Sequence, residues 1–196
     1  MHGLKTRLRD WAVRHAASPR AGRWLAILSF AEASFFPIPP DVLLLSILSA
    51  RQSHRWRYYA LIATVWSVAG GVAGYVIGKF LYDSIGVFLV ETYNLGDTLG
   101  AIRIVFSDNA FLAVFLGGFT PIPYKAFTLS AGFFNINFFV FMAASVLSRA
   151  MRFFAVGYIM KIFGKEIGAF VFRYFNILTI LFGVVLVLFA LLFSVR

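Results

Sequence analysis

Five charged side chains stand inside stretches of sequence that are otherwise apolar enough to lie within a membrane. They are two carboxylates and three cations: Glu32, Asp41, Lys125, Arg149 and Arg152. A charged side chain at the middle of a membrane costs about 2.5–3.5 kcal/mol on insertion scales, so such residues pair with one another or serve a function. Arg149 and Arg152 are three positions apart, and they therefore share one face of a helix.

Two kinds of chemistry fit these side chains. The guanidiniums can form buried salt bridges with Glu32 or Asp41, or they can bind an anionic group such as a lipid phosphate. Burial favours the neutral form of a carboxyl group and a nearby arginine favours the charged form, so the two acids are candidates for proton or cation coupling. Lys125 is a further candidate for the phosphate, and the alternative is that its side chain extends to the membrane surface.

The composition is that of an integral membrane protein. Of 196 residues, 61% are hydrophobic and 18% are aromatic, whereas soluble domains are about 45–50% apolar. The net charge of +10 comes from short Lys and Arg clusters between apolar runs, so we expect a positive-inside membrane protein and no nucleic-acid partner.

Enzymatic and metal-dependent functions are not expected. The chain has no cysteine, and its three histidines lie near the amino terminus or in a basic loop (His2, His15 and His54). These positions predict no metal site and no cofactor. The motifs of metalloproteases, serine hydrolases and phosphate-binding loops do not occur either, so we expect a protein that is not an enzyme.

Proline clusters interrupt two of the apolar stretches. The prolines are Pro37, Pro39 and Pro40 in the first stretch and Pro121 and Pro123 in the second. A proline lacks a backbone donor and clashes with the preceding helical turn, so no straight helix passes through either cluster. The arms of the first stretch, 24–36 and 42–50, are about 14–20 Å long, well short of a hydrocarbon core of about 30 Å. We therefore predict re-entrant helical hairpins over 24–50 and 110–134, with one kinked helix over 24–50 as the alternative.

Each predicted hairpin precedes a segment long enough to cross a membrane. These crossings are 58–82 and 138–163, and they complete two repeats, 24–95 and 96–173. Pro37 and Pro121 are 84 positions apart, and Gly74 and Gly157 are 83 apart. A nearly constant offset between matching residues indicates an internal duplication. Within the first crossing, Gly70, Gly74 and Gly78 recur every four residues, a spacing typical of close helix packing.

The ends of the chain and its charges predict an orientation. Residues 1–23 indicate an amphipathic interfacial segment, with a frayed basic tail as the alternative, and 174–196 indicate a final transmembrane helix. If each hairpin enters and leaves on one side, the basic segments all lie on one side and the acidic connector lies on the other. The positive-inside rule then makes the amino terminus cytoplasmic and the carboxyl terminus external. The expected location of this multi-pass protein is the inner membrane. The halves have inverted topology, as in many transporters, although such repeats can also be purely architectural.

The motifs together resemble the DedA family of membrane proteins, also called the SNARE-associated or VTT-domain family, and most closely its YqaA-like branch. Three elements carry the resemblance: Glu32, Phe36-Pro37, Pro39 and Asp41; then Tyr75-Val76-Ile77-Gly78-Lys79; then Phe119, Pro121, Ala131 and Gly132. Many members carry arginines where this chain has Gly118 and Tyr124. The cations here are instead Lys125, Arg149 and Arg152, so arginine roles do not transfer position by position.

The resemblance implies an all-α fold with two facing re-entrant hairpins and an activity that moves lipids across the bilayer. The expected function is a flippase or scramblase for phospholipid or polyprenyl phosphate, with membrane lipids and protons as partners. Glu32 and Asp41 are assigned to proton or cation coupling, and Arg149, Arg152 and Lys125 to the phosphate. A proton-coupled small-ion antiporter and a scaffold for envelope assembly are the alternatives, and homo-oligomer formation is left open.

Overall fold

The computed structural model describes residues 18, 20–35, 39–49, 53–87, 104, 106, 108–120 and 123–162. This part of the chain folds into helices and turns without β-strands, so the prediction of an all-α chain is confirmed. The predicted interfacial segment (most of 1–23), the middle of the acidic connector and the final crossing 174–196 lie outside the described residues.

The helices, in chain order, are α2 (Ala21–Ser34), α3 (Asp41–Ile47), the 3₁₀ turn η2 (Ser53–Arg55), α4 (Trp56–Leu81), the π-helical turn η3 (Tyr82–Gly86), α7 (Ala110–Phe119), α8 (Tyr124–Phe133) and the helix Phe138–Ile162.

Two helices of the described chain, α4 and Phe138–Ile162, are long and apolar enough to cross a membrane. They correspond to the predicted crossings 58–82 and 138–163, with ends that differ by a few residues. Both present large apolar side chains outward, among them Phe80, which is 68% exposed, and Phe139, which is 81% exposed. Such a surface is unusual for a soluble protein and suits a lipid environment.

The two proline clusters break the helices at the predicted places. α2 ends at Ser34 and α3 begins at Asp41, directly after Pro40; α7 ends at Phe119 and α8 begins at Tyr124, directly after Pro123. A proline just before a helix loses no hydrogen bond, because the first helical turn has no acceptor for its N–H groups. Pro40 is buried, Pro39 and Pro123 are exposed, and Pro37 and Pro121 lie outside the described residues.

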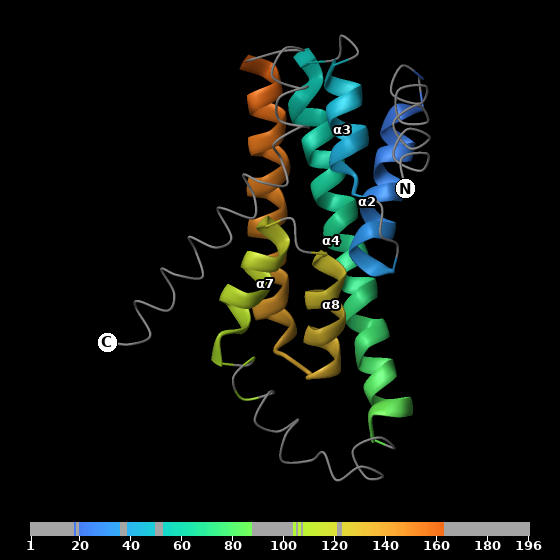
Figure 1. Cartoon of the computed structure of the whole chain (residues 1–196), viewed down its shortest axis with the longest axis vertical. Coiled ribbons are helices and arrows are strands. Elements are labelled where there is room, and N and C mark those ends of the chain that lie inside the picture. The colour runs from blue at the N-terminus through green and yellow to red at the C-terminus, as the bar shows by residue number, and fades with distance from the viewer. Residues whose placement is uncertain are drawn as a thin grey trace, which may run out of the picture.

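Each pair of short helices forms an antiparallel hairpin (Figure 1). The α2–α3 hairpin opens toward the end of the bundle where α4 begins, and the α7–α8 hairpin opens toward the end where α4 finishes. The helix ends on either side of the two breaks, in α2 and α3 and in α7 and α8, lie near the middle of the long axis of the bundle. Broken helix ends from the two halves are therefore brought to the same level.

The glycines of α4 lie where other helices pack closest against it. A Cβ atom on Gly70 would overlap the carbonyl of Phe30 in α2, and one on Gly78 would overlap the carbonyl of Leu129 in α8. Gly74, between them, faces the side chain of Thr128 in α8. The absence of a side chain lets both hairpins approach the backbone of α4 directly.

A polar layer separates two apolar clusters along the long helices. One cluster includes Trp56 and Phe153, and the other includes Tyr75 and Ala144. Between these positions, α4 carries buried Thr64 and Ser67, and the helix Phe138–Ile162 carries buried Ser145, Ser148, Arg149 and Arg152. The charged residues therefore lie in a polar layer at the middle of the bundle, its waist, at the level of the helix breaks.

Candidate functional site

Arg149 is almost completely buried, with 2% of its surface exposed, and it joins both hairpins to α4. Its Nη2 donates to Glu32 Oε2 at 2.7 Å, its Nη1 donates to the carbonyl of Gly118 at 3.2 Å, and its Nε donates to Ser67 Oγ at 2.6 Å. The flat guanidinium also lies 4.8 Å from the ring centres of Tyr124 and Phe153. An ion pair of this kind is stable in an apolar interior only because hydrogen bonds satisfy the remaining donors.

Arg152, one helical turn further on, binds Asp41 through two nitrogens. Nη2 donates to Oδ2 at 2.6 Å, and Nε lies 3.4 Å from Oδ1. Its Nη1 donates to the carbonyls of Phe119 and Thr120, at 3.2 Å and 2.5 Å. One guanidinium therefore holds the start of α3 and the end of α7 together.

The helix ends explain why charges of these signs meet here. The last carbonyls of α7 have no partner within the helix and carry partial negative charge, so they attract Arg149 and Arg152. Asp41 lies in the first turn of α3, where the N–H groups carry partial positive charge and favour a carboxylate. The proline breaks thus create the groups that the buried charges bind.

Neutral hydrogen bonds reinforce the contact between the hairpins. Thr128 Oγ1 in α8 donates to the carbonyl of Ala33 in α2 at 3.0 Å. The hydroxyl of Tyr124 donates to Ser145 Oγ at 2.5 Å, which fixes the ring that lies against Arg149.

Two relatives share most of this chain. An uncharacterized protein of Haemophilus influenzae is 37% identical over 148 residues, which cover 74% of this chain and 75% of the relative. An "uncharacterized protein HI0703 homolog" of Histophilus somni is 34% identical over 148 residues, with the same coverage. The chain belongs to the family of these two proteins. No family model and no solved structure matches the chain. A function for the chain therefore has to be inferred from the geometry of its polar layer.

Four of the five predicted charged residues meet in one layer. Arg149 with Glu32 and Arg152 with Asp41 form the two salt bridges of the described chain. Lys125 in α8 is half-buried and forms no salt bridge with a described acid. The structure therefore does not bring Lys125 into the ion-paired cluster.

Sequence reasoning missed the residues that accept from and surround the arginines. Ser67 accepts from Arg149, Tyr124 and Phe153 flank its guanidinium, and main-chain carbonyls of the α7 end accept from both arginines. A lone serine in an apolar helix was a weak signal for Ser67. Carbonyl acceptors leave no signal in a sequence except the proline break that frees them.

Ser29, in α2, is fully buried, and its Oγ has no hydrogen-bond partner in the described part of the chain. We expect Ser29→Ala to raise the free energy of unfolding by about 1 kcal/mol, because the change removes a desolvated hydroxyl and improves helix propensity. Detergent-solubilised protein unfolded with increasing sodium dodecyl sulfate gives the measurement. Ser67→Ala is the matched control, and it should destabilise the protein because it removes an acceptor of Arg149. A loss of stability in Ser29→Ala would contradict this account.

Proposed function

We propose that this protein is a membrane transporter of the DedA type that moves phospholipid or polyprenyl-phosphate headgroups between leaflets of the inner membrane, as a flippase or scramblase. The observation that supports the proposal best is the pair of buried salt bridges between the hairpin breaks. Each bridge joins an acid of the first hairpin to a cation that also holds the end of α7. Broken helices that meet at mid-bilayer around charged groups are the usual substrate sites of transporters with inverted repeats.

The ion pairs suggest how a phosphate would be received. Phosphate and carboxylate can each accept two hydrogen bonds from a guanidinium, so a headgroup can take the place of Glu32 or Asp41 on its arginine. A displaced carboxylate would be left buried and charged, at high cost, unless it takes up a proton. Glu32 is the more accessible acid, with 13% of its side chain exposed against 7% for Asp41. We assign Glu32 to the first exchange and proton uptake to the displaced acid.

The departure from the DedA pattern fits the same site. Where many DedA members carry arginines, this chain has Gly118 and Tyr124, and both residues contact Arg149. In this chain the guanidinium of Arg149, from the helix Phe138–Ile162, lies against both positions. We propose that Arg149 supplies the charge that the second hairpin supplies in those members.

The charges at the helix ends support the proposed orientation. Arg20 and Arg23 lie at the start of α2, Arg55 and Arg57 at the start of α4, and Lys161 at the end of the helix Phe138–Ile162, and all five are exposed. These helix ends gather at one end of the bundle (Figure 1). By the positive-inside rule, we place that end in the cytoplasm together with the amino terminus, and the two hairpins re-enter from opposite faces.

A reconstituted flipping assay tests the function. The protein is placed in liposomes with a trace of lipid carrying a fluorescent headgroup, and dithionite bleaches only the outer leaflet. We expect the wild type to make the inner-leaflet pool accessible and Glu32→Gln to slow this roughly tenfold, the factor that corresponds to about 1.4 kcal/mol. Asp83→Asn, which changes an exposed acid beyond α4, should match the wild type. A wild type that accelerated exchange of no phospholipid and no polyprenyl phosphate would end the proposal.

A scaffold function remains a second candidate because both arginines are engaged in internal bonds, as in a structural brace. The two functions differ in the double variant Glu32→Gln with Arg149→Gln, which removes both charges of one ion pair. A scaffold that still folds would keep its cellular activity in this variant. A transporter would be impaired, because the acid assigned to the first exchange and its arginine are both removed.

A further inference from the structure

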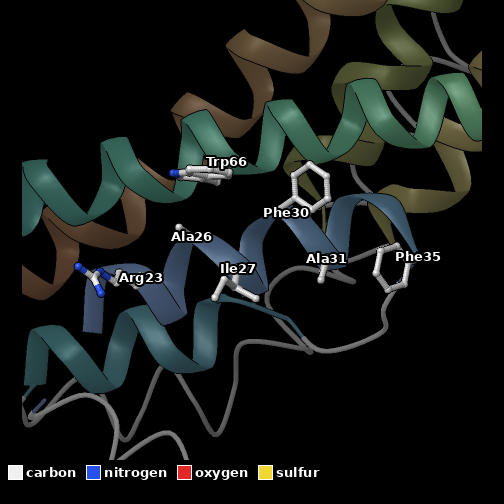
Figure 2. A pocket seen from close by; sticks show the side chains of 7 residues that line it. All are labelled: Arg23, Ala26, Ile27, Phe30, Ala31, Phe35 and Trp66. Atoms are coloured by element: carbon white, nitrogen blue, oxygen red, sulfur yellow. The ribbon is translucent and has the colours of Figure 1, made fainter. Parts of the chain in front are cut away.

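An apolar groove of about 420 Å³ runs along the outer side of α2. Ile27, Phe30 and Phe35 line it from α2 and its carboxyl end, and Trp66 lines it from α4. Figure 2 shows these side chains along α2, with Arg23 toward one end and Phe35 at the other. Arg23 is the charged member of an otherwise apolar lining.

The length of the groove fits one leaflet of a bilayer. Arg23 and Phe35 are twelve positions apart on a helical path, which corresponds to about 18 Å. Half of a hydrocarbon core of about 30 Å is about 15 Å. A groove that starts at the basic end of the bundle and finishes beside the first hairpin turn therefore spans the depth of a single acyl chain.

The charge at the Arg23 end of the groove favours one type of lipid. Arg23 is exposed and forms no salt bridge with a described acid. Arg20, on the same face three positions earlier, adds to the positive potential. Basic side chains at a membrane surface favour anionic headgroups, whose phosphates they bind.

We propose that this groove binds one acyl chain of an anionic phospholipid from the leaflet at the basic end, with its phosphate on Arg23. The bound chain fills the space beside Phe30 and Trp66, whose rings meet edge to face with centres 6.5 Å apart. Ala31, at the far part of the groove, directly precedes Glu32, so the lipid stabilises the helix that carries the acid bound to Arg149. The inference rests on membrane insertion, as the proposed function does, but not on transport.

Fluorescence of Trp66 tests the site. The full chain with Trp11, Trp24 and Trp56 changed to phenylalanine is reconstituted in phosphatidylcholine that contains a small fraction of lipid with brominated acyl chains, which quench tryptophan on contact. We expect brominated phosphatidylglycerol to quench at about fivefold lower mole fraction than brominated phosphatidylcholine, as one cationic contact predicts. Arg23→Gln should abolish that preference, and Arg20→Gln, which lies outside the lining, should keep most of it.

Two further measurements separate the outcomes. Ala31→Leu, which fills the groove while Arg23 is intact, should also remove the preference. Native mass spectrometry of the unaltered sequence should show one retained anionic phospholipid that is lost in Arg23→Gln. Equal quenching by both lipids would overturn the proposal in favour of a non-selective lipid annulus, and no quenching by either would indicate that residues 1–17 or a second copy of the chain covers the groove. Loss of the preference in Arg23→Gln with flipping unchanged would leave the proposed function standing, and the flipping assay can fail while this site is present.

Discussion

Changing Asp41 to asparagine lowers the free energy of unfolding by about 3 kcal/mol, because it leaves the Arg152 guanidinium buried without a counter-charge. Asparagine has nearly the same size and keeps one oxygen that can accept from Arg152. The loss therefore reports the charge rather than a cavity. We expect the same change to loosen the contact between the hairpins, because Arg152 also holds the carbonyls of Phe119 and Thr120.

The double variant Asp41→Asn with Arg152→Gln gives the decisive comparison. Removing both charges should cost less than the sum of the single changes, since neither partner is left as an unpaired ion. Asp83→Asn, at an exposed acid, should change stability by no more than about 0.5 kcal/mol. Sodium dodecyl sulfate titration or thermal unfolding in detergent measures all four variants, including Arg152→Gln alone. An Asp41→Asn protein as stable as the wild type would show that this ion pair does not hold the waist of the bundle together.

Gly78→Ala is expected to cost about 2–3 kcal/mol, the range of an overpacked core. The new methyl group would meet the main-chain carbonyl of Leu129, which has no rotamer to change, so α4 and α8 must separate. Gly132→Ala approaches the same interface from α8, where the methyl group would meet the carbonyl of Tyr75, and it should show a similar loss.

Gly22→Ala is the matched control for this prediction. A methyl group at Gly22 would lie 3.3 Å from Cδ1 of Ile62, the end of a flexible side chain that can move aside. Alanine also favours the helix by up to about 1 kcal/mol over glycine. We therefore expect Gly22→Ala to be neutral or slightly stabilising in the same assay. A Gly78→Ala protein as stable as Gly22→Ala would mean that α8 does not approach α4 as closely as the structure has it.

Local rules predicted much of the fold. Proline chemistry located both helix breaks, because a missing donor acts on its own turn whatever the rest of the chain does. Length and hydropathy located the two long helices, because both are properties of the segment itself. The start of α2 was less accurate. The first hairpin arm was predicted to begin at residue 24, whereas the helix begins at Ala21, whose N–H donates to the carbonyl of Ser18.

The pairing of the charges could not be predicted from the sequence. Glu32 and Arg149 are 117 positions apart, and Asp41 and Arg152 are 111 apart. Which acid meets which arginine depends on how the two hairpins pack against α4, and one-dimensional patterns do not encode that packing. The same holds for Tyr124, which was visible in the sequence as a departure from the DedA pattern and lies against Arg149 only in three dimensions.

The two salt bridges also determine how this protein would respond to membrane voltage. Glu32 and Asp41 together balance Arg149 and Arg152, so a movement of these four groups as one body transfers no net charge across the electric field. A proton captured by either acid breaks that balance by one elementary charge, whose movement through a potential of 100 mV is worth about 2.3 kcal/mol. A rearrangement of the paired core alone would therefore be electrically silent. In the proposed exchange, a singly charged phosphate on the arginine would restore the balance that protonation of the displaced acid breaks.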